Sequence, residues 1–335
     1  MKRLILPKGY SSKLSLLETE IAIKYVKDTF ERDLAKKLKL VRVSAPLFVF
    51  PSTGLNDNLN GHERRVSFDI NGVDEPVEIV QSLAKWKRNA LGAYGFKVGE
   101  GLYTDMNAIR RDEDLDTIHS AYVDQWDWEK IITSSDRNKT YLKSIVKKIY
   151  SVIKGLEEKV YKKYPNLEPT LPKDITFITT RELEKMYPDL TANEREYEIV
   201  KKHGAVFIMQ IGCKLKSGYP HDGRAADYDD WSLNGDIMLY YKELDIAFEI
   251  SSMGIRVDSE SILKQLKEKN EMSKLENKYV QDVVNNRLPL TIGGGIGQSR
   301  LCMFMLKKAH IGEVQASIWE EKDLKVLNDN NIHLL

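Results

Sequence analysis

The chain has 335 residues, of which 42% are hydrophobic and 30% charged, a balance typical of a globular protein with a well-buried core. Lys and Arg total 51 against 50 Asp and Glu, so the net charge of +1 provides no global basic field for binding DNA or tRNA. No stretch approaches the roughly 20 consecutive apolar residues of a membrane span. We therefore expect small-molecule ligands, with no nucleic-acid and no membrane partner.

The cysteines and the first residues predict the location of the protein. Cys213 and Cys302 lie in apolar runs without a partner at metal-ligand spacing, which is typical of buried thiols in a reducing compartment. The stretch 1–12 begins with basic residues but has an apolar segment of only three residues, which is too short for a signal peptide. We expect the protein in the cytoplasm.

A long helix is predicted first in the chain. Ser15 and Glu18 form a capping-box pattern, and a helix is expected to follow to about Leu38. Its apolar face is expected to consist of Leu17, Ile21, Phe30 and Leu34. A strand broken by Pro46 follows, and then a polar, turn-rich stretch at 52–64.

The middle of the chain alternates between short strands and helices. The stretch 64–80 predicts a hairpin with an Asn-Gly turn, and 82–95 predicts a short helix. Further helices are expected at 141–165, 194–204, 260–272 and 274–286, and apolar strands at 205–212, 235–241 and 245–251. Strands and helices do not alternate regularly, so we expect an α+β fold with a mostly antiparallel sheet flanked by helices. A single catalytic domain over 1–335 is the simplest organisation.

Four glycines occur within five positions of the segment 290–306. No lysine follows them, which excludes a P-loop, and Gln298 stands where the dinucleotide fingerprint needs glycine. What remains is the pattern G-x-G-x-G-x-x-R, formed by Gly293, Gly295, Gly297 and Arg300. We interpret it as a strand that lets a flat ligand lie against its backbone, followed by an arginine that holds a terminal phosphate. The alternative is a glycine-rich turn with a surface arginine.

The segment 108–129 predicts two strands joined by a charged loop. Arg110 or Arg111 comes directly before an acidic stretch, and His119 lies near the end of the loop. Polar side chains continue into the second strand at Tyr122, Asp124, Gln125, Asp127 and Glu129. Alone, such a hairpin is more often a solvated face. Together with the glycine segment, it indicates a site for a charged ligand.

Two carboxylates interrupt otherwise apolar strands, Asp236 in "LNGDIMLYY" and Glu249 in "DIAFEISSMGIR". A buried carboxylate is costly unless it is paired or bound to a cation. Mg²⁺ typically binds one or two carboxylates together with phosphate oxygens. We therefore predict that Asp236 and Glu249 bind Mg²⁺ with a nucleotide. The alternative is an ion pair of each with an internal arginine, Arg224 or Arg256.

Together these segments resemble the catalytic core of class II aminoacyl-tRNA synthetases. The helix and strand at 15–50 are similar to the first motif of that fold, which forms a dimer interface. "RRDEDLDTIHSAYVDQWDWE" (110–129) is similar to the second motif and "GGGIGQSR" (293–300) to the third. "QSLAKWKR" (81–88) resembles the substrate-lysine motif of aspartyl-tRNA synthetases, with Lys87 at the lysine position.

Longer strings narrow the resemblance to the aspartate–ammonia ligase family, the ammonia-dependent asparagine synthetases. They are "DNLNG", "SLAKWKR", "GEGLYT", "YVDQWDWE", "DYDDW", "LNGDI", "SSMGIRVD" and "TIGGGIGQSRL", and they span Asp57 to Leu301. The resemblance implies a homodimer that makes asparagine from aspartate, ATP and ammonia. It also implies a β-aspartyl-adenylate intermediate, release of AMP and pyrophosphate, and a requirement for Mg²⁺.

The resemblance also implies a nucleotide-binding set. Arg110 is expected to hold the α-phosphate and the attacking carboxylate, with Arg111 as a rival at a similar spacing. Arg300 is expected to hold the γ-phosphate, and His119 to help at the phosphate tail. The full set is Arg110, His119, Asp236, Glu249, Gly295, Gly297 and Arg300, in which Asp236 and Glu249 are the metal ligands.

Aspartate carries two carboxylates and an ammonium, so its pocket needs both signs of charge. By resemblance, the binding set is Ser82, Lys87, Gln125, Asp127, Asp229, Ser251 and Arg256. Lys87 is expected as the cationic contact and Arg256 as the contact of the α-carboxylate, while Asp127 and Asp229 are candidates for the ammonium. Asp57 is the expected acceptor of the proton that ammonium loses, and it completes the catalytic set with Arg110 and Arg300.

Some features depart from the family pattern. Ala226 replaces a usual proline, and only Ser232 separates "DYDDW" from "LNGDI", where the family often has a longer loop. The loop between Arg110 and His119 is also one residue short. Two alternatives differ in function: an aspartyl- or asparaginyl-tRNA synthetase relative, for which no anticodon domain is evident, and a non-catalytic paralogue that binds amino acid or nucleotide.

Overall fold

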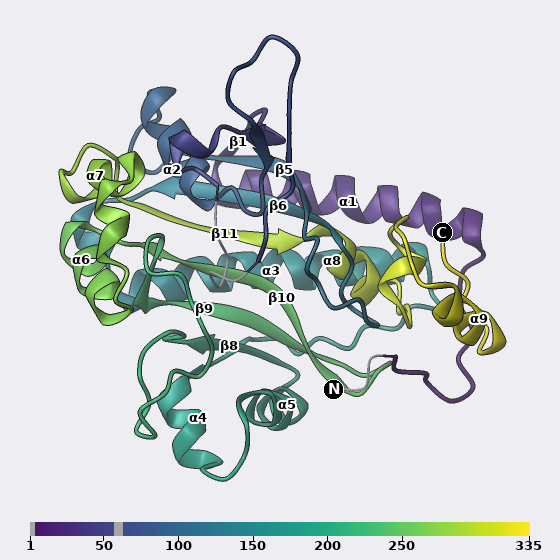
Figure 1. The fold of residues 1–335 in the computed structure, drawn as a ribbon. Helices are drawn as coiled ribbons and strands as arrows, with labels where there is room; N and C mark the ends of the chain where they lie inside the picture. The colour runs from purple at the N-terminus through teal and green to yellow at the C-terminus, as the bar shows by residue number, and fades with distance from the viewer. Residues whose placement is uncertain (1–3, 57–62) are drawn as a thin grey trace.

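A mixed eight-stranded sheet lies at the centre of the fold (Figure 1). The computed structural model describes residues 4–56 and 63–335. The strand order is β1-β5-β6-β11-β10-β9-β8-β7, with parallel pairing only between β1 and β5 and between β7 and β8. The strands are β1 Leu40–Arg42, β5 Gly101–Ile109, β6 Tyr122–Ile131, β7 Thr176–Thr179, β8 Ala205–Met209, β9 Asp229–Tyr241, β10 Ile246–Arg256 and β11 Thr291–Gly297. This confirms the predicted α+β fold with a mostly antiparallel sheet.

The long strand β9 resolves one departure from the family pattern. The short connection at 231–236 is part of the strand itself, which pairs with β10 through most of its length. No separate loop therefore exists at this point of the described chain. The segment that reaches over the sheet instead precedes β9, at 217–228.

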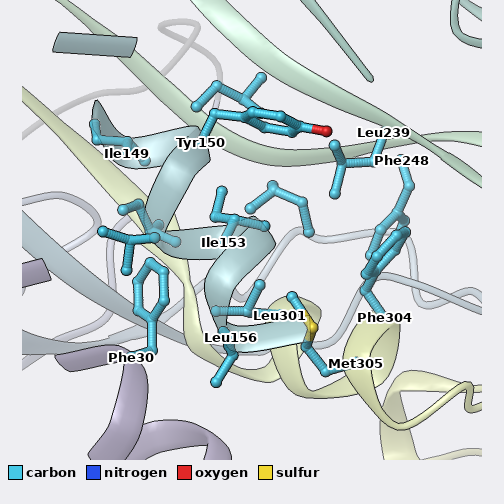
Figure 2. Packing of buried hydrophobic residues seen from close by; sticks show 14 of the residues in the cluster. Phe30, Ile149, Tyr150, Ile153, Leu156, Leu239, Phe248, Leu301, Phe304 and Met305 are labelled. Atoms are coloured by element: carbon cyan, nitrogen blue, oxygen red, sulfur yellow. The ribbon is translucent and has the colours of Figure 1, made fainter. Parts of the chain in front are cut away.

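The helices α1 Leu16–Leu38 and α3 Lys139–Lys163 pack side by side behind the sheet (Figure 1). Figure 2 shows the core where side chains from α1, α3, the strands and the helix α8 Gln298–Met305 meet. Phe30 contributes from α1, Ile153 from α3 and Phe304 from α8, and each is fully buried. Burying a side chain of this size contributes about 1.5–3 kcal/mol, so this core fixes α8 against the sheet.

The capping box predicted for α1 is confirmed. The backbone N–H of Glu18 donates to Ser15 Oγ, and Glu18 accepts in return from the Ser15 backbone at 2.8 Å. The predicted apolar face is wrong for two positions, because Leu17 is 72% and Ile21 53% exposed. At 100° per residue, positions 13 apart differ by about 220°, so Leu17 and Ile21 cannot share a face with Phe30 and Leu34.

A small second sheet, in the order β2-β4-β3, stands beside the main one. Its strands are β2 Phe48–Val49, β3 Ser67–Phe68 and β4 Val77–Ile79. The antiparallel pairing of β3 with β4 confirms the predicted hairpin, and Gly72 supplies the positive φ of its turn. The predicted helix at 82–95 is confirmed as α2 Ala84–Ala93. Asp57, the expected proton acceptor, lies outside the described residues.

The remaining helices surround the ends of the main sheet. They are α4 Thr180–Met186, α5 Ala192–His203, α6 Ser259–Glu268, α7 Lys278–Val284 and α9 Glu321–Asp329, with 3₁₀ turns at Pro51–Thr53, Ser134–Asp136, Met272–Glu276 and Ile311–Glu313. Sequence reasoning missed β7, α4 and α9, which are short, with four, seven and nine residues. Within residues 4–56 and 63–335, no helix is both long and apolar enough to cross a membrane.

Candidate active site

A cavity of about 410 Å³ opens on the face of the sheet formed by β6, β10 and β11. The loop before β6 and the segment before β9 complete its walls. The predicted site residues that line it are Ser82, Lys87, Arg110, His119, Gln125, Asp127, Asp229, Glu249, Ser251, Arg256, Gly295, Gly297 and Arg300. Residues far apart in the sequence are thus brought together in one pocket, as the predicted site requires.

The glycines of the third motif lie within strand β11. Gly293 pairs with Glu129 of β6 and Gly295 with Asp127. A Cβ on Gly293 would come within 1.9 Å of Glu129 Oε2, and one on Gly295 within 2.3 Å of Gln125 Oε1. These glycines therefore leave room for the protein's own polar side chains, in addition to any ligand.

Alternate residues of β6 provide those side chains. Gln125, Asp127 and Glu129 are two positions apart, so all three face the same side of the sheet. Sequence reasoning placed Gln125 and Asp127 in the site but gave Glu129 no role. The signal was present, because the same period of two extends to Glu129.

One end of the cavity, which we call the closed end, is lined by Lys87, Asp127, Asp229 and Arg256, with Glu129 buried behind them against Arg256. All five side chains are buried. Arg256 Nη2 lies 2.8 Å from Glu129 Oε2, and its Nη1 donates to Asp229. Lys87 Nζ donates to Asp127 and to the carbonyl of Gly294. The predicted aspartate contacts thus already form ion pairs with each other.

Burial and ion pairing shift the pKa values at the closed end in different directions, and burial raises the pKa of Asp229. Burial works to raise the pKa of Glu129, but the Arg256 guanidinium outweighs it and lowers the pKa below its ordinary value. Burial lowers the pKa of Lys87, against the opposing effect of Asp127. Asp127 Oδ2 is buried and has no hydrogen-bond partner among the described residues. This oxygen is therefore able to accept a hydrogen bond from a ligand.

The other end, which we call the open end, is lined by Arg110, His119, Arg224, Glu249 and Arg300. Asp236, which was predicted as a site residue, does not line the cavity and lies buried beside it, paired with Arg224. Arg300 lies on the first turn of α8 and is 22% exposed. Its Nη1 donates to the backbone carbonyl of Glu249 at 3.1 Å and lies 3.5 Å from that residue's carboxylate, which is 41% exposed. This end therefore presents cations that are only partly neutralised.

The two carboxylates predicted to bind Mg²⁺, Asp236 and Glu249, differ in their surroundings. Asp236 is buried and forms an ion pair with Arg224, the partner named as the alternative to a metal. Its Oδ1 has no hydrogen-bond partner in the described part of the chain. Burial raises the pKa of Asp236 to about 7, and the negative charge of Glu249 adds to the effect. The two carboxylates therefore repel each other, and a divalent cation between them would remove that cost.

No group of three or more His, Cys, Asp or Glu side chains among residues 4–56 and 63–335 is arranged to hold a metal by itself.

The two candidate arginines of the second motif differ in position. Arg110 lines the cavity, whereas Arg111 is exposed to solvent. The backbone N–H of Arg110 donates to the Ala121 carbonyl at 2.8 Å, so its position is fixed at the end of the β5–β6 ladder. The geometry favours Arg110 as the arginine that meets a ligand.

Asp124 is a further residue that sequence reasoning left without a role. Its carboxylate accepts from the backbone N–H of Ser299 and from Lys27 Nζ, both at 3.0 Å. It therefore ties the first turn of α8, which carries Arg300, to strand β6 and to α1. An acidic group at this place also complements the positive end of the helix.

Comparison with known proteins gives a consistent result. A family model described as aspartate-ammonia ligase matches residues 17–331. The chain is 60% identical to the aspartate–ammonia ligase of Ruminiclostridium cellulolyticum over 336 residues, covering 100% of both chains. It is 61% identical to the aspartate–ammonia ligase of Clostridium perfringens strain SM101, again over 100% of both.

Solved structures with lower sequence identity show the same fold. An asparaginyl-tRNA synthetase of Entamoeba histolytica in complex with asparaginyl-adenylate superposes with a TM-score of 0.65 at 14% identity, covering 91% of this chain and 68% of that one. Asparaginyl-tRNA synthetase of Pyrococcus horikoshii, also complexed with asparaginyl-adenylate, gives 0.63 at 17% identity, with coverages of 90% and 70%. These likenesses confirm the class II synthetase-like fold.

Proposed function

The chain belongs to the aspartate–ammonia ligase family, and from this premise we propose that its pocket converts aspartate, ATP and ammonia into asparagine, AMP and pyrophosphate. As a member of that family it is a ligase of asparagine biosynthesis. The observation that carries the proposal is identity of about 60% to curated aspartate–ammonia ligases over the whole chain. The pocket supports it, because it holds both signs of charge at one end and a group of cations at the other.

The first step activates the substrate. An oxygen of the aspartate β-carboxylate attacks the α-phosphorus of ATP, the bond to the bridging oxygen breaks, and pyrophosphate leaves. Such transfers depend on positioning and charge stabilisation. Arg110 is proposed to hold the α-phosphate and the attacking carboxylate, and Arg300 the γ-phosphate. Gly295 and Gly297 line the same wall and are proposed to lie against the nucleotide.

The closed end is proposed to bind aspartate. Lys87 and Arg256 supply the positive charge that two carboxylates require, while Asp127 and Asp229 supply the negative charge for the ammonium group. Gln125, Ser82 and Ser251 add neutral hydrogen bonds. Support comes from the unpartnered Asp127 Oδ2 and from Ser251 Oγ, which is likewise buried without a hydrogen-bond partner among the described residues. Each of these atoms is able to bond a polar ligand.

The second step forms the amide. Ammonia attacks the acyl carbon of β-aspartyl adenylate, the bond to the phosphate oxygen breaks, and AMP leaves with that electron pair. Ammonium must first lose a proton, and a nearby carboxylate is the natural acceptor. Asp57 is our proposed acceptor, on the resemblance of "DNLNG" to the family. Asn56 next to it is anchored, since its side chain donates to Glu78 at 3.1 Å.

Mg²⁺ is proposed to bind with ATP at Asp236 and Glu249. The fit rests on the unpartnered Asp236 Oδ1 and on the repulsion between the two carboxylates. When bound, Mg²⁺ would neutralise negative charge on the departing pyrophosphate. Arg224 forms an ion pair with Asp236 and lines the cavity, where it is placed to turn toward phosphate.

We also propose a homodimer formed through 15–50. Leu17 and Ile21 on α1 are exposed apolar residues, as expected of a helix that packs against a second copy. Two substitutions, Leu17→Asp and Ile21→Asp, should produce monomers in light-scattering measurements. The cytoplasmic location stays a prediction, with which the unpaired thiols of Cys213 and Cys302 are compatible.

Product analysis tests the proposed function. The purified protein would be incubated with Mg²⁺, ATP and aspartate, with and without ammonium, and scored for AMP, ADP and asparagine. Ammonium-dependent asparagine together with AMP is expected. Formation of ADP would contradict the adenylate route, and tight binding of ATP or aspartate without turnover would favour the non-catalytic alternative.

A further inference from the structure

The loop between β5 and β6 contains a carboxylate–imidazole pair. Both oxygens of Asp116 lie 2.9 Å from Nδ1 of His119. The imidazole lines the open end of the cavity. Asp116 itself was not assigned a role from the sequence.

Asp116 also shapes the loop that carries His119. Its Oδ1 accepts from the backbone N–H of Ile118 at 2.7 Å and of His119 at 2.8 Å. In the other direction, the backbone N–H of Asp116 donates to the His119 carbonyl at 3.3 Å. Several hydrogen bonds therefore converge on Asp116 and close the turn. Aspartate is favoured at such positions because its side chain bonds nearby backbone N–H groups.

The base of this turn is fixed to the body of the protein. Ile311 donates its backbone N–H to the Thr117 carbonyl at 2.9 Å, and Ile5 donates to Thr117 Oγ1 at 2.8 Å. Thr117 and Ile118 are both buried. With the backbone held in this way, the main freedom left to His119 is the rotation of its ring, and Asp116 restrains that rotation.

The chemistry of the pair determines which ring nitrogen meets a ligand. An ionised carboxylate only accepts hydrogen bonds, so Nδ1 must carry the hydrogen that Asp116 accepts. Burial works to raise the pKa of Asp116, but hydrogen bonds from His119 and the backbone lower it, so the carboxylate is ionised at neutral pH. The nitrogen that is left for a ligand is Nε2.

We propose that Asp116 is a positioning residue that fixes the tautomer and the ring orientation of His119, so that Nε2 contacts the polyphosphate of the nucleotide. This inference rests on the proposed function, because it takes ATP as the ligand of the open end. A phosphate oxygen at Nε2 requires a proton there too, and the negative charge of Asp116 balances the imidazolium that results. Asp116 acts only through His119 and touches no substrate itself.

Asp116→Asn tests the orientation directly. The Asn oxygen still accepts the two backbone N–H groups, so the turn is kept, while the amide NH₂ replaces the oxygen that faced Nδ1. Nitrogen NMR of ¹⁵N-histidine-labelled full-length protein, with His119 assigned through His119→Gln, reports which ring nitrogen carries the hydrogen in the neutral ring. We expect Nδ1–H in the wild type and Nε2–H in Asp116→Asn. The same tautomer in both proteins would overturn the proposal.

Kinetics test whether the orientation matters to the nucleotide. Asp116→Asn should lower kcat/KM for ATP by about tenfold and leave the KM for aspartate unchanged. In the His119→Gln background the same substitution should have no further effect, because its only route of action is removed. An equal loss in both backgrounds would overturn the proposal. Asp114→Asn, at an exposed acidic position in the same loop, is the matched control and should behave as the wild type.

The two readouts separate this inference from the proposed function. Absence of asparagine and AMP from the wild-type protein would refute the proposed function, whereas the NMR result does not depend on turnover. A wild type that makes asparagine but shows Nε2–H at His119 would refute the inference alone.

Discussion

The closed and open ends of the cavity balance their charges in different ways. At the closed end, Arg256 is held by Glu129 and Asp229, and all three side chains are at most 3% exposed. At the open end, Arg300 and Glu249 are 3.5 Å apart and partly exposed to water. The cations of the closed end are fully paired with buried carboxylates, whereas those of the open end are only partly neutralised and leave positive charge for a ligand.

The difference follows from the cost of burial. A buried charge without a partner is far more costly than one in contact with water, so the closed end must contain its own counter-charges before any substrate arrives. Its side chains come from strands β6, β9 and β10 and from helix α2, which hold those partners rigidly. The open end is built largely on loops and on the first turn of α8, where water screens cations that are only partly neutralised.

The largest effect is expected from Arg256→Met, which would leave Glu129 and Asp229 as buried carboxylates without their cation. The free energy of unfolding should fall by about 3–5 kcal/mol. Urea unfolding measures it. The matched variant at the open end, Arg224→Met, should cost only about 1–2 kcal/mol, because Asp236 is able to bind a proton near neutral pH. Equal losses would contradict the distinction between the two ends.

Next in size is the effect of Arg110→Ala on catalysis. Removing a cation from the α-phosphate should reduce kcat/KM for ATP by about 10²–10³-fold, with an unchanged melting temperature. Arg111→Ala, one residue along and exposed, should stay close to the wild type. Steady-state kinetics of both variants decide between the two arginines, and a larger loss in Arg111→Ala would reverse the assignment.

A smaller effect is expected from Gly293→Ala at the closed end. Neither Gly293 nor Gly297 has a positive φ, so the substitution acts through space alone. The new Cβ would collide with Glu129 Oε2, and we expect a loss of about 1–3 kcal/mol and a raised KM for aspartate. In Gly297→Ala the nearest atom is Arg300 Cβ at 3.2 Å, so thermal unfolding should change little. Equal changes in melting temperature would count against the crowding at Glu129.

Mild acid should destabilise the fold through His310, which is buried just before the 3₁₀ turn at Ile311–Glu313. Burial lowers the pKa of His310 to about 4, whereas the unfolded chain binds this proton near pH 6.5. Between these values the unfolded state binds more protons, so the free energy of unfolding falls as the pH falls, by about 2 kcal/mol at pH 5. His310→Asn retains an acceptor for the Gly312 N–H and should show a shallower decline from pH 6.5 to 4. Parallel curves would rule out His310 as the titrating group.

Local patterns in the sequence were enough to predict much of the fold. The capping box at Ser15, the Asn-Gly hairpin and the glycine-rich strand leading into the helix of Arg300 depend on residues only a few positions apart. Such signals act within one turn or one strand pair, so they can be recognised without the rest of the chain. The motif strings likewise predicted which residues would line one cavity.

Which charge pairs with which was decided only by the tertiary structure. Glu129 and Arg256 are 127 positions apart, and they meet because β11 lies between β6 and β10 with glycine at the crossing point. The tertiary structure likewise decided that Asp236 pairs with Arg224. It also decided that Leu17 stays exposed, because the helix turns that residue away from the core. The sequence by itself determined the local elements and the residue types of the site. The register of the sheet and the packing of distant segments determined which charged side chains pair. A buried charge is costly without a partner, so the fold has to bring opposite charges together.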